Sequence, residues 1–185
     1  MMSSDWRIAT AAPDRDPVTA YLGLGSNVGD RGTNLAAALR RIAVQVEVLD
    51  LSSVWESEPV GWTSQASFWN LVVRARTQDP PASLLMAMKQ IEADIGRTPT
   101  FVNGPREIDI DLLLYDDIVL HTGSLDIPHP RMMTRAFVLR PLIELEPGIQ
   151  VTGTGRTARD HLEHGGPFER AFRLFPAGTL VEGIA

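Results

Sequence analysis

The sequence contains no cysteine and only one lysine. Without a thiol the chain forms no disulfide, has no cysteine nucleophile and offers no thiolate to a metal. This composition is typical of a cytoplasmic protein, which is where we expect the chain to act. Lys89 is the single lysine among 17 basic residues. Any bound phosphate must therefore be held almost entirely by arginine, which can bind it through two parallel N–H donors.

Long apolar runs are also missing. No stretch is long enough for a membrane-spanning helix, and residues 1–16 lack the apolar segment of a signal peptide, so we expect a flexible leader there. The net charge of -6 argues against broad nucleic-acid binding. Residues 17–185 are enough for one core, so we expect a single domain, with weaker patterning beyond about residue 152.

The periodicity of apolar residues predicts an alternation of strands and helices. The expected elements are strands at 18–24, 46–55, 68–76 and from 108, a short strand at 118–121, and helices at 34–46, 82–95, 132–145 (broken at Pro141) and 157–163. Two middle strands follow each other without a helix between them, which indicates a largely antiparallel sheet. The sequence therefore predicts an α+β fold, a ferredoxin-like α/β sandwich with helices packed on the sheet.

The glycine-rich segment 23–29 is predicted to be a tight turn between the first strand and the first helix. Its spacing, G-x-G-x-x-x-G, is one residue away from the dinucleotide-binding fingerprint, and the strand-helix-strand context of that fingerprint is absent. Both facts count against a dinucleotide-dependent oxidoreductase. The phosphate-loop pattern G-x-x-x-x-G-K-[ST] does not occur.

Two aspartates stand at alternate positions of the segment GPREIDIDLLLY, residues 104–115. Successive side chains of a strand point to opposite faces, so Asp109 and Asp111 share one face. A hard cation such as Mg²⁺, with phosphate oxygens as its other ligands, would explain two carboxylates side by side. A solvated strand face with incidental aspartates is the alternative. The apolar residues expected on the opposite face are Ile108, Ile110, Leu112 and Leu114.

Other side chains could complete a site around the aspartates. Arg97 and Arg106 bracket the preceding loop, where they could close on phosphates, although they could equally be solvated. His129 lies between two prolines that fix its backbone, and it is either functional or structural. Phe68 and Asn70 share one strand face and could hold a heteroaromatic ring, with core packing as the alternative for Phe68.

Taken together, these motifs resemble the 6-hydroxymethyl-7,8-dihydropterin pyrophosphokinase family, over about residues 18–148. The resemblance is carried by segments that occur in the family's order. They are YLGLGSN at 21–27, SEPVG at 57–61, FWN at 68–70, IE at 91–92 with GR at 96–97, GPREIDID at 104–111, and IPHP at 127–130 with RAF at 135–137.

The resemblance implies transfer of pyrophosphate from ATP to the hydroxymethyl group of the pterin, with AMP as the second product. It implies that Asp109 and Asp111 hold two Mg²⁺ ions and that Arg97 and Arg106 stabilise the transferring group. The implied pterin-binding residues are Ser57, Val60, Gly61, Phe68, Asn70 and Phe137. The implied ATP-binding residues are Glu92, Arg97, Arg106, Leu112, His129 and Arg135.

The resemblance also implies that loops 58–66 and 97–106 close over the substrates. Family members often carry a tryptophan before the Gly-Pro-Arg segment, where this chain has Asn103. We expect a monomer with small-molecule substrates that binds neither nucleic acid nor membranes. A non-catalytic nucleotide- or pterin-binding module is a second hypothesis, but such a binder would need no metal pair.

Overall fold

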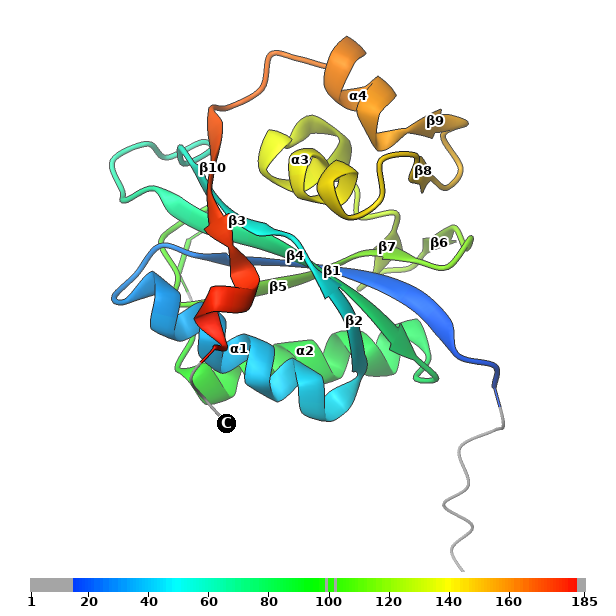
Figure 1. The fold of residues 1–185 in the computed structure, drawn as a ribbon, viewed down its shortest axis with the longest axis horizontal. Coiled ribbons are helices and arrows are strands. Elements are labelled where there is room, and N and C mark those ends of the chain that lie inside the picture. Colours follow the sequence, from blue (N-terminus) through cyan, green and yellow to red (C-terminus); the bar gives the residue numbers. More distant parts are fainter. Residues whose placement is uncertain (1–14, 99, 102, 183–185) are drawn as a thin grey trace, which may run out of the picture.

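A computed structural model describes residues 15–98, 100–101 and 103–182, so the expected leader lies almost entirely outside the described residues. A six-stranded antiparallel sheet crosses the middle of the molecule (Figure 1). Its strands are β1 (Val18–Ser26), β2 (Glu47–Leu51), β3 (Ser53–Ser57), β4 (Phe68–Thr77), β5 (Asp109–Tyr115) and β10 (Ala171–Pro176). The order is β10-β3-β4-β1-β5, and β2 also pairs with β4.

Helices cover both faces of this sheet. The helices α1 (Arg31–Gln45) and α2 (Pro81–Ile95) lie on one face, and α3 (Ala136–Leu145) and α4 (Ala158–His164) lie on the other (Figure 1). The order β3-β4-β1-β5, with α1 and α2 as the connecting helices, confirms the predicted ferredoxin-like sandwich. The remaining short elements are the pairs β6 (Leu120–His121) with β7 (Asp126–Ile127) and β8 (Gln150–Val151) with β9 (Arg156–Thr157), and the 3-10 helices η1 (Met132–Thr134) and η2 (Ala177–Leu180).

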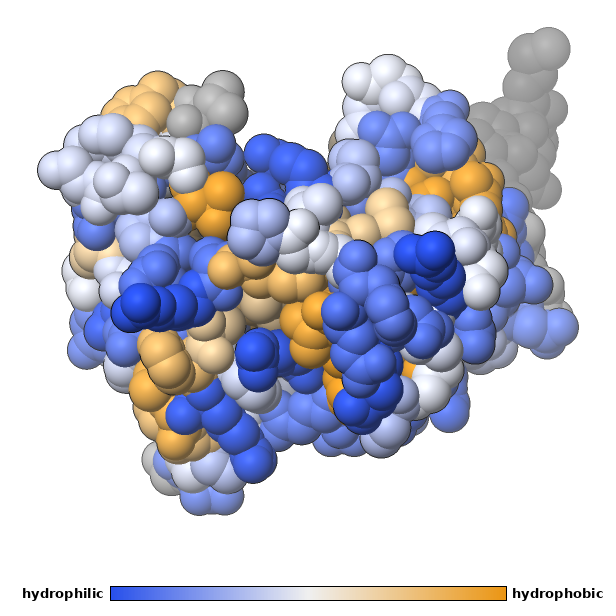
Figure 2. All heavy atoms as spheres, turned by 90° about the horizontal axis from the view of Figure 1, so that it is seen from above, coloured by the Kyte–Doolittle hydropathy of each residue, from blue (hydrophilic) through white to orange (hydrophobic). Residues whose placement is uncertain are grey.

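Each face of the sheet has its own apolar core. Leu22, Ile42 and Met88 are fully buried between the sheet and the helices α1 and α2. Leu139 and Leu142 of α3 are fully buried on the other face. Seen from above, over α3 and α4, hydrophobic and hydrophilic residues are intermixed on the surface (Figure 2). In the described part of the chain, no helix has the length and apolarity needed to cross a membrane.

The predicted glycine turn is wrong, because β1 continues through it to Ser26. Gly23 and Gly25 are strand residues that pair with β4 on one side and β5 on the other. The chain turns only after β1, and the side chain of Asp30 accepts a hydrogen bond from the backbone N–H of Thr33 at 2.9 Å to cap α1.

The predicted strand 46–55 is two strands, β2 and β3, separated at Ser52. The Ser52 N–H donates to the Val72 carbonyl at 3.0 Å, and the Ser52 hydroxyl accepts from the Val72 N–H at 2.9 Å. This side-chain bond takes the place of a ladder bond, so the chain bends while staying against β4. Periodicity could not show it, because the apolar pattern continues across the bend.

Two expectations for the later helices and strands are also wrong. The predicted helix 132–145 begins only at Ala136 and continues through Pro141, although proline removes one N–H donor. The apolar face of α3 is buried on the sheet, which outweighs that loss. Of the short strand predicted at 118–121, only residues 120–121 form a strand, β6. The strand β10 was not predicted, because most of its side chains are exposed.

A β-bulge in β5 explains why Leu114 lies on the other face of the sheet from the one predicted for it. The β1–β5 register shifts between Tyr21 and Leu22, which leaves Leu113 without a partner. Leu112 lies in the core under α1 and α2, as predicted, whereas both Leu113 and Leu114 lie in the core under α3. The bulge therefore changes which face the strand presents, but only after both aspartates.

The core under Asp109 and Asp111 gives a first testable prediction. Ile110, which lies between them, is fully buried. Replacing Ile110 by alanine should lower the free energy of unfolding by about 2–5 kcal/mol, because it removes buried methyl groups and leaves a cavity. Urea unfolding measures the change. Val44→Ala, at a position that is 81% exposed, is the control and should stay within about 0.5 kcal/mol.

Candidate active site

Strand register brings the polar residues of the sheet into rows. Gly25 of β1 pairs with Asn70 of β4 on one side and with Asp109 of β5 on the other. Gly23 stands in the same way beside Asp111. Neighbouring strands lie about 4.8 Å apart, so Asn70 and Asp109 stand roughly 10 Å apart with only a glycine between them. Gly25 has no side chain between them, and a Cβ added to it would come within 3.1 Å of the Asn70 side-chain oxygen.

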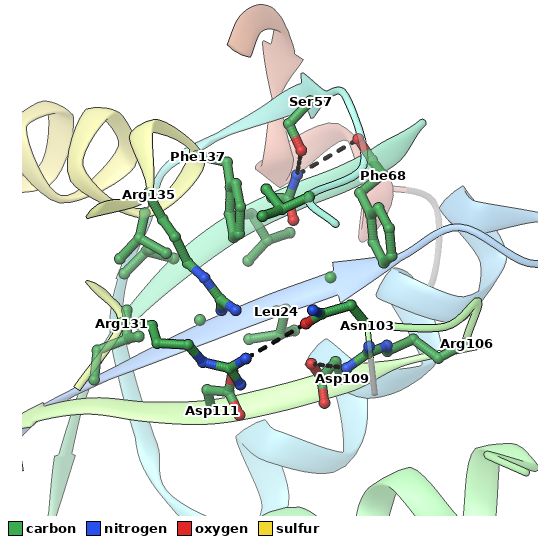
Figure 3. A pocket seen from close by; sticks show the side chains of 18 of the residues that line it. Leu24, Ser57, Phe68, Asn103, Arg106, Asp109, Asp111, Arg131, Arg135 and Phe137 are labelled. Carbon is green, nitrogen blue, oxygen red and sulfur yellow. Dashed lines mark hydrogen bonds and ion pairs between the residues drawn. The ribbon is translucent and has the colours of Figure 1, made fainter. Parts of the chain in front are cut away.

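A pocket lies over these rows, on the face of the sheet that α3 covers in part (Figure 3). It holds about 720 Å³, counting space open to solvent. The predicted site residues that line it are Ser57, Val60, Phe68, Asn70, Arg106, Asp109, Asp111, Arg135 and Phe137.

One end of the pocket is acidic, and two arginines neutralise it. Arg97 Nη1 lies 2.8 Å from Asp109 Oδ1, and Arg106 Nη1 lies 2.7 Å from Asp109 Oδ2 (the Arg106 contact is drawn in Figure 3). Burial alone would raise the pKa of Asp109, but the charges of Arg106 and Arg97 outweigh it and lower the pKa. Asp109 is therefore ionised at neutral pH, as a ligand of a cation must be.

A buried carboxylate supports this acidic end from below. Glu92 of α2 is 3% exposed. Its Oε1 accepts from the backbone N–H of Ile110 at 2.6 Å and from Lys89 at 2.7 Å, and its Oε2 is paired with Arg97. Glu92 does not line the pocket. It fixes the start of β5 and one guanidinium beside Asp109, so it positions the site.

The wall opposite the aspartates is basic. Arg131 and Arg135 both line the pocket and point into it (Figure 3). Burial and the neighbouring charge of Arg131 lower the pKa of Arg135. The Arg131 guanidinium lies 3.4 Å from the Asn103 side-chain oxygen. Arg131 was not predicted as a site residue. Its position directly after Pro128-His129-Pro130 was the one sequence feature that could have indicated it.

His129 stands next to the second aspartate rather than in the pocket wall. Its Nε2 lies 3.8 Å from Asp111 Oδ2, and its Nδ1 is 3.3 Å from the backbone N–H of Arg131. That N–H donates to Nδ1, so a neutral ring carries its proton on Nε2, facing Asp111. Burial lowers the pKa of His129 despite the nearby Asp111, which favours this neutral form.

The other end of the pocket is aromatic. Phe68 and Phe137 approach it from opposite sides (Figure 3), and Asn70 lines it as well. The Asn70 amide donates to Ser57 Oγ at 2.9 Å. With the amide in this orientation, its oxygen lies above Gly25, facing the pocket. A flat heterocycle between the rings could donate to that oxygen.

Two loops meet at the rim of the pocket. Gly61 lies beside the Asn103 side chain, since a Cβ there would come within 3.1 Å of the Asn103 amide nitrogen. Gln65 donates to the Asn103 carbonyl at 2.9 Å. Trp62 and Phe101 pack edge to face with ring centroids 5.1 Å apart. The loops at 58–66 and 97–106 therefore touch each other.

The predicted residues outside the pocket lining have distinct places. Arg97 lies beside Asp109, Gly61 at the rim, and His129 beside Asp111. Leu112 was expected to bind ATP, but its side chain is buried in the core under α1 and α2. The structure therefore gives the Leu112 side chain a packing role.

The acidic end of the pocket supplies only some of the ligands that a divalent cation needs. Among the described residues, no group of three or more histidine, aspartate or glutamate side chains gathers as a metal cluster. Asp109 and Asp111 supply two carboxylates on one face, which suits Mg²⁺ that takes its remaining ligands from phosphate and water. The donor set therefore fits a cation that arrives with a phosphate substrate.

A family model described as 7,8-dihydro-6-hydroxymethylpterin-pyrophosphokinase matches residues 21–147, well over half of the chain. The chain belongs to this family. The match includes every predicted site residue, from Ser57 to Phe137.

Curated members of the pyrophosphokinase family resemble the chain closely. The 2-amino-4-hydroxy-6-hydroxymethyldihydropteridine pyrophosphokinase of Aquifex aeolicus is 44% identical over 131 residues, which are 71% of this chain and 82% of the relative. That of Bacillus subtilis is 45% identical over 128 residues, covering 68% and 77%. The folic acid synthesis protein of Dictyostelium discoideum is 42% identical, but this chain spans only 19% of its length.

Solved structures of HPPK-DHPS from Plasmodium falciparum share the fold of this pyrophosphokinase-family chain. One has a TM-score of 0.68 at 16% sequence identity and covers 82% of this chain. The chain corresponds to 46% of that protein, so it spans about half of its length.

The buried carboxylate under the site gives the second prediction. Glu92→Ala should lower the free energy of unfolding by about 3 kcal/mol, because it leaves Lys89, Arg97 and a backbone N–H without their shared partner. Urea unfolding measures the loss. Asp94→Ala, on an exposed position of the same helix, is the matched control and should change the free energy by less than about 0.5 kcal/mol. Equal stability of the two variants would contradict the supporting role of Glu92.

Proposed function

We propose that this protein transfers the pyrophosphoryl group of ATP to the hydroxymethyl oxygen of 6-hydroxymethyl-7,8-dihydropterin, giving AMP and the pterin diphosphate for folate synthesis. The observation that supports this proposal most directly is the pairing of Gly25 with Asn70 on one side and with Asp109 on the other. It joins an end suited to a flat heterocycle with an end suited to phosphates and a cation, across one open pocket.

The aromatic end holds the pterin. Phe68 and Phe137 stack on the two faces of its ring, and the Asn70 oxygen accepts a ring N–H. Val60 and Gly61 limit the pocket on the loop side. In this orientation the hydroxymethyl group of the pterin points over Gly25 toward the aspartates.

The charged end holds the triphosphate. Asp109 and Asp111 are the proposed ligands of two Mg²⁺ ions, and such ions neutralise phosphate charge and orient the oxygens of an in-line displacement when bound. When Asp109 ligates a cation, Arg97 and Arg106 lose a partner and become available for phosphate oxygens. Arg131 and Arg135 supply positive charge from the opposite wall, and His129 can donate through Nε2.

The chain's own residues act on the reaction by position and charge. The pterin hydroxyl oxygen forms a bond to the β-phosphorus of ATP while the bond from that phosphorus to the α,β-bridging oxygen breaks. AMP leaves with that oxygen, and the hydroxyl proton is released. The arginines stabilise negative charge on the transferring group, which is the main way a protein accelerates phosphoryl transfer. The two rim loops, which already contact each other, limit one side of the space in which the groups react.

We further propose that the enzyme works as a monomer in the cytoplasm. One chain's pocket holds both an end suited to a flat ring and an end suited to phosphates, which supports a complete site in each molecule. ATP, the proposed co-substrate, is available in the cytoplasm.

Product analysis tests the proposed function directly. The protein is incubated with ATP, Mg²⁺ and 6-hydroxymethyl-7,8-dihydropterin, and the nucleotides are separated by chromatography. We expect AMP and pterin diphosphate in equal amounts. ADP as the product would mean transfer of a single phosphoryl group. Pterin binding without any nucleotide product would instead support a non-catalytic module.

The metal ligands give a further prediction. Asp109→Ala and Asp111→Ala should each lower kcat by a factor on the order of 10³ or more, because each removes a charge that binds the cation. Pterin binding, measured by calorimetry without nucleotide, should stay close to that of the wild type. Asp117→Ala, in the turn after β5, is the control. Near-normal turnover in either variant would remove that aspartate from the metal site.

A further inference from the structure

The tail of the chain returns to the active site. The family match ends at residue 147, whereas Glu169 lies between α4 and β10. Glu169 Oε1 accepts a hydrogen bond from the backbone N–H of Phe137 at 3.0 Å. Phe137 is the second residue of α3, and Arg135, at the N-cap position of that helix, makes no side-chain capping bond. Glu169 therefore supplies the cap that the local sequence does not.

A carboxylate at this position suits the end of a helix. The first backbone N–H groups of a helix have no partner within it, and the helix N-terminus carries partial positive charge. Here the capped N–H belongs to the residue whose ring lines the pterin end of the pocket. Any shift in the first turn of α3 moves the Phe137 ring, and with it Arg135, whose guanidinium lies 5.4 Å from the ring centroid.

The residues after Glu169 connect to the neighbouring wall of the same pocket. The carbonyl of Arg170 accepts from the backbone N–H of Glu58 at 3.2 Å, and Ala171 pairs with Ser57 as β10 begins. Ser57 and Glu58 both line the pocket. Three consecutive tail residues therefore tie the first turn of α3 to the end of β3, along the edge of the sheet seen in Figure 1.

We propose that Glu169 is a positioning residue for pterin binding, which acts by capping α3 and so fixing the ring of Phe137. This inference rests on the proposed function, since it concerns the same pocket. It assigns to the tail a role in substrate affinity that lies outside the matched family region. Glu169 acts through Phe137.

Three substitutions at one position separate the cap from the charge. Glu169→Ala removes the acceptor. Glu169→Gln keeps an acceptor oxygen at the same reach but removes the charge, and Glu169→Asp keeps the charge but shortens the reach. The control is Glu163→Ala, which removes an exposed carboxylate of α4. The Kd for 6-hydroxymethyl-7,8-dihydropterin is measured by calorimetry on the full chain, and the KM for ATP and the Tm are measured alongside.

We expect Glu169→Ala and Glu169→Asp to raise the pterin Kd by roughly tenfold, the effect of losing one ordinary helix cap. Glu169→Gln should restore most of the affinity, and the KM for ATP should change less than the pterin Kd. Glu163→Ala should match the wild type.

Other outcomes overturn the inference. An unchanged pterin Kd in Glu169→Ala shows that the cap does not position the ring. A fall in Tm with equal losses for pterin and ATP, not rescued by glutamine, shows that Glu169 only supports the fold. If the wild type forms no pterin diphosphate from ATP and the pterin, the proposed function fails and this inference fails with it. If the wild type binds the pterin normally and Glu169→Ala binds it with the same Kd, only this inference fails and the proposed function stands.

Discussion

The pairing of β1 with β4 on one side and β5 on the other is the constraint on which the site depends. This register sets Asn70 and Asp109 in one row and leaves a glycine between them. Backbone hydrogen bonds fix the separation of the two ends of the pocket more tightly than loops could. The distance between a bound ring and a bound phosphate is therefore a property of the sheet, and the helices and loops add the groups around it.

The charges of the site compensate each other without ligands. Arg97 and Arg106 neutralise Asp109, and Glu92 pairs with Arg97 and Lys89 below it. A pair of unmatched aspartates would repel each other and destabilise β5. Arriving phosphates and cations exchange partners with groups that are already in place, so the chemistry needs little rearrangement of the backbone at this end. The rim loops contact each other through Gln65, which donates to the Asn103 carbonyl, and through the rings of Trp62 and Phe101.

Much of this arrangement could be predicted from the sequence, because local patterns determine it. Alternation placed Asp109 and Asp111 on one face, and the order of elements predicted the ferredoxin-like sandwich. The misses have physical causes that periodicity does not record. A side-chain bond at Ser52 bends a strand, a bulge at Leu113 redirects Leu114, and the tail strand β10 has no apolar alternation. Arg131 was missed because its sequence position after Pro128-His129-Pro130 does not show that its side chain turns into the pocket.

The floor of the pocket also has a consequence for how an enzyme of this kind could become resistant to inhibitors. The floor of the pocket at Gly25 carries no side chain, and an added methyl group there would come within 3.1 Å of the Asn70 side-chain oxygen. A compound that fills the space above Gly25 contacts a surface that cannot acquire a side chain without obstructing the natural substrate as well. Resistance by substitution would have to arise at other lining positions, such as Val60 and Asn103 at the rim. Inhibitors designed to contact the floor and leave the rim alone would offer the fewest sites for escape.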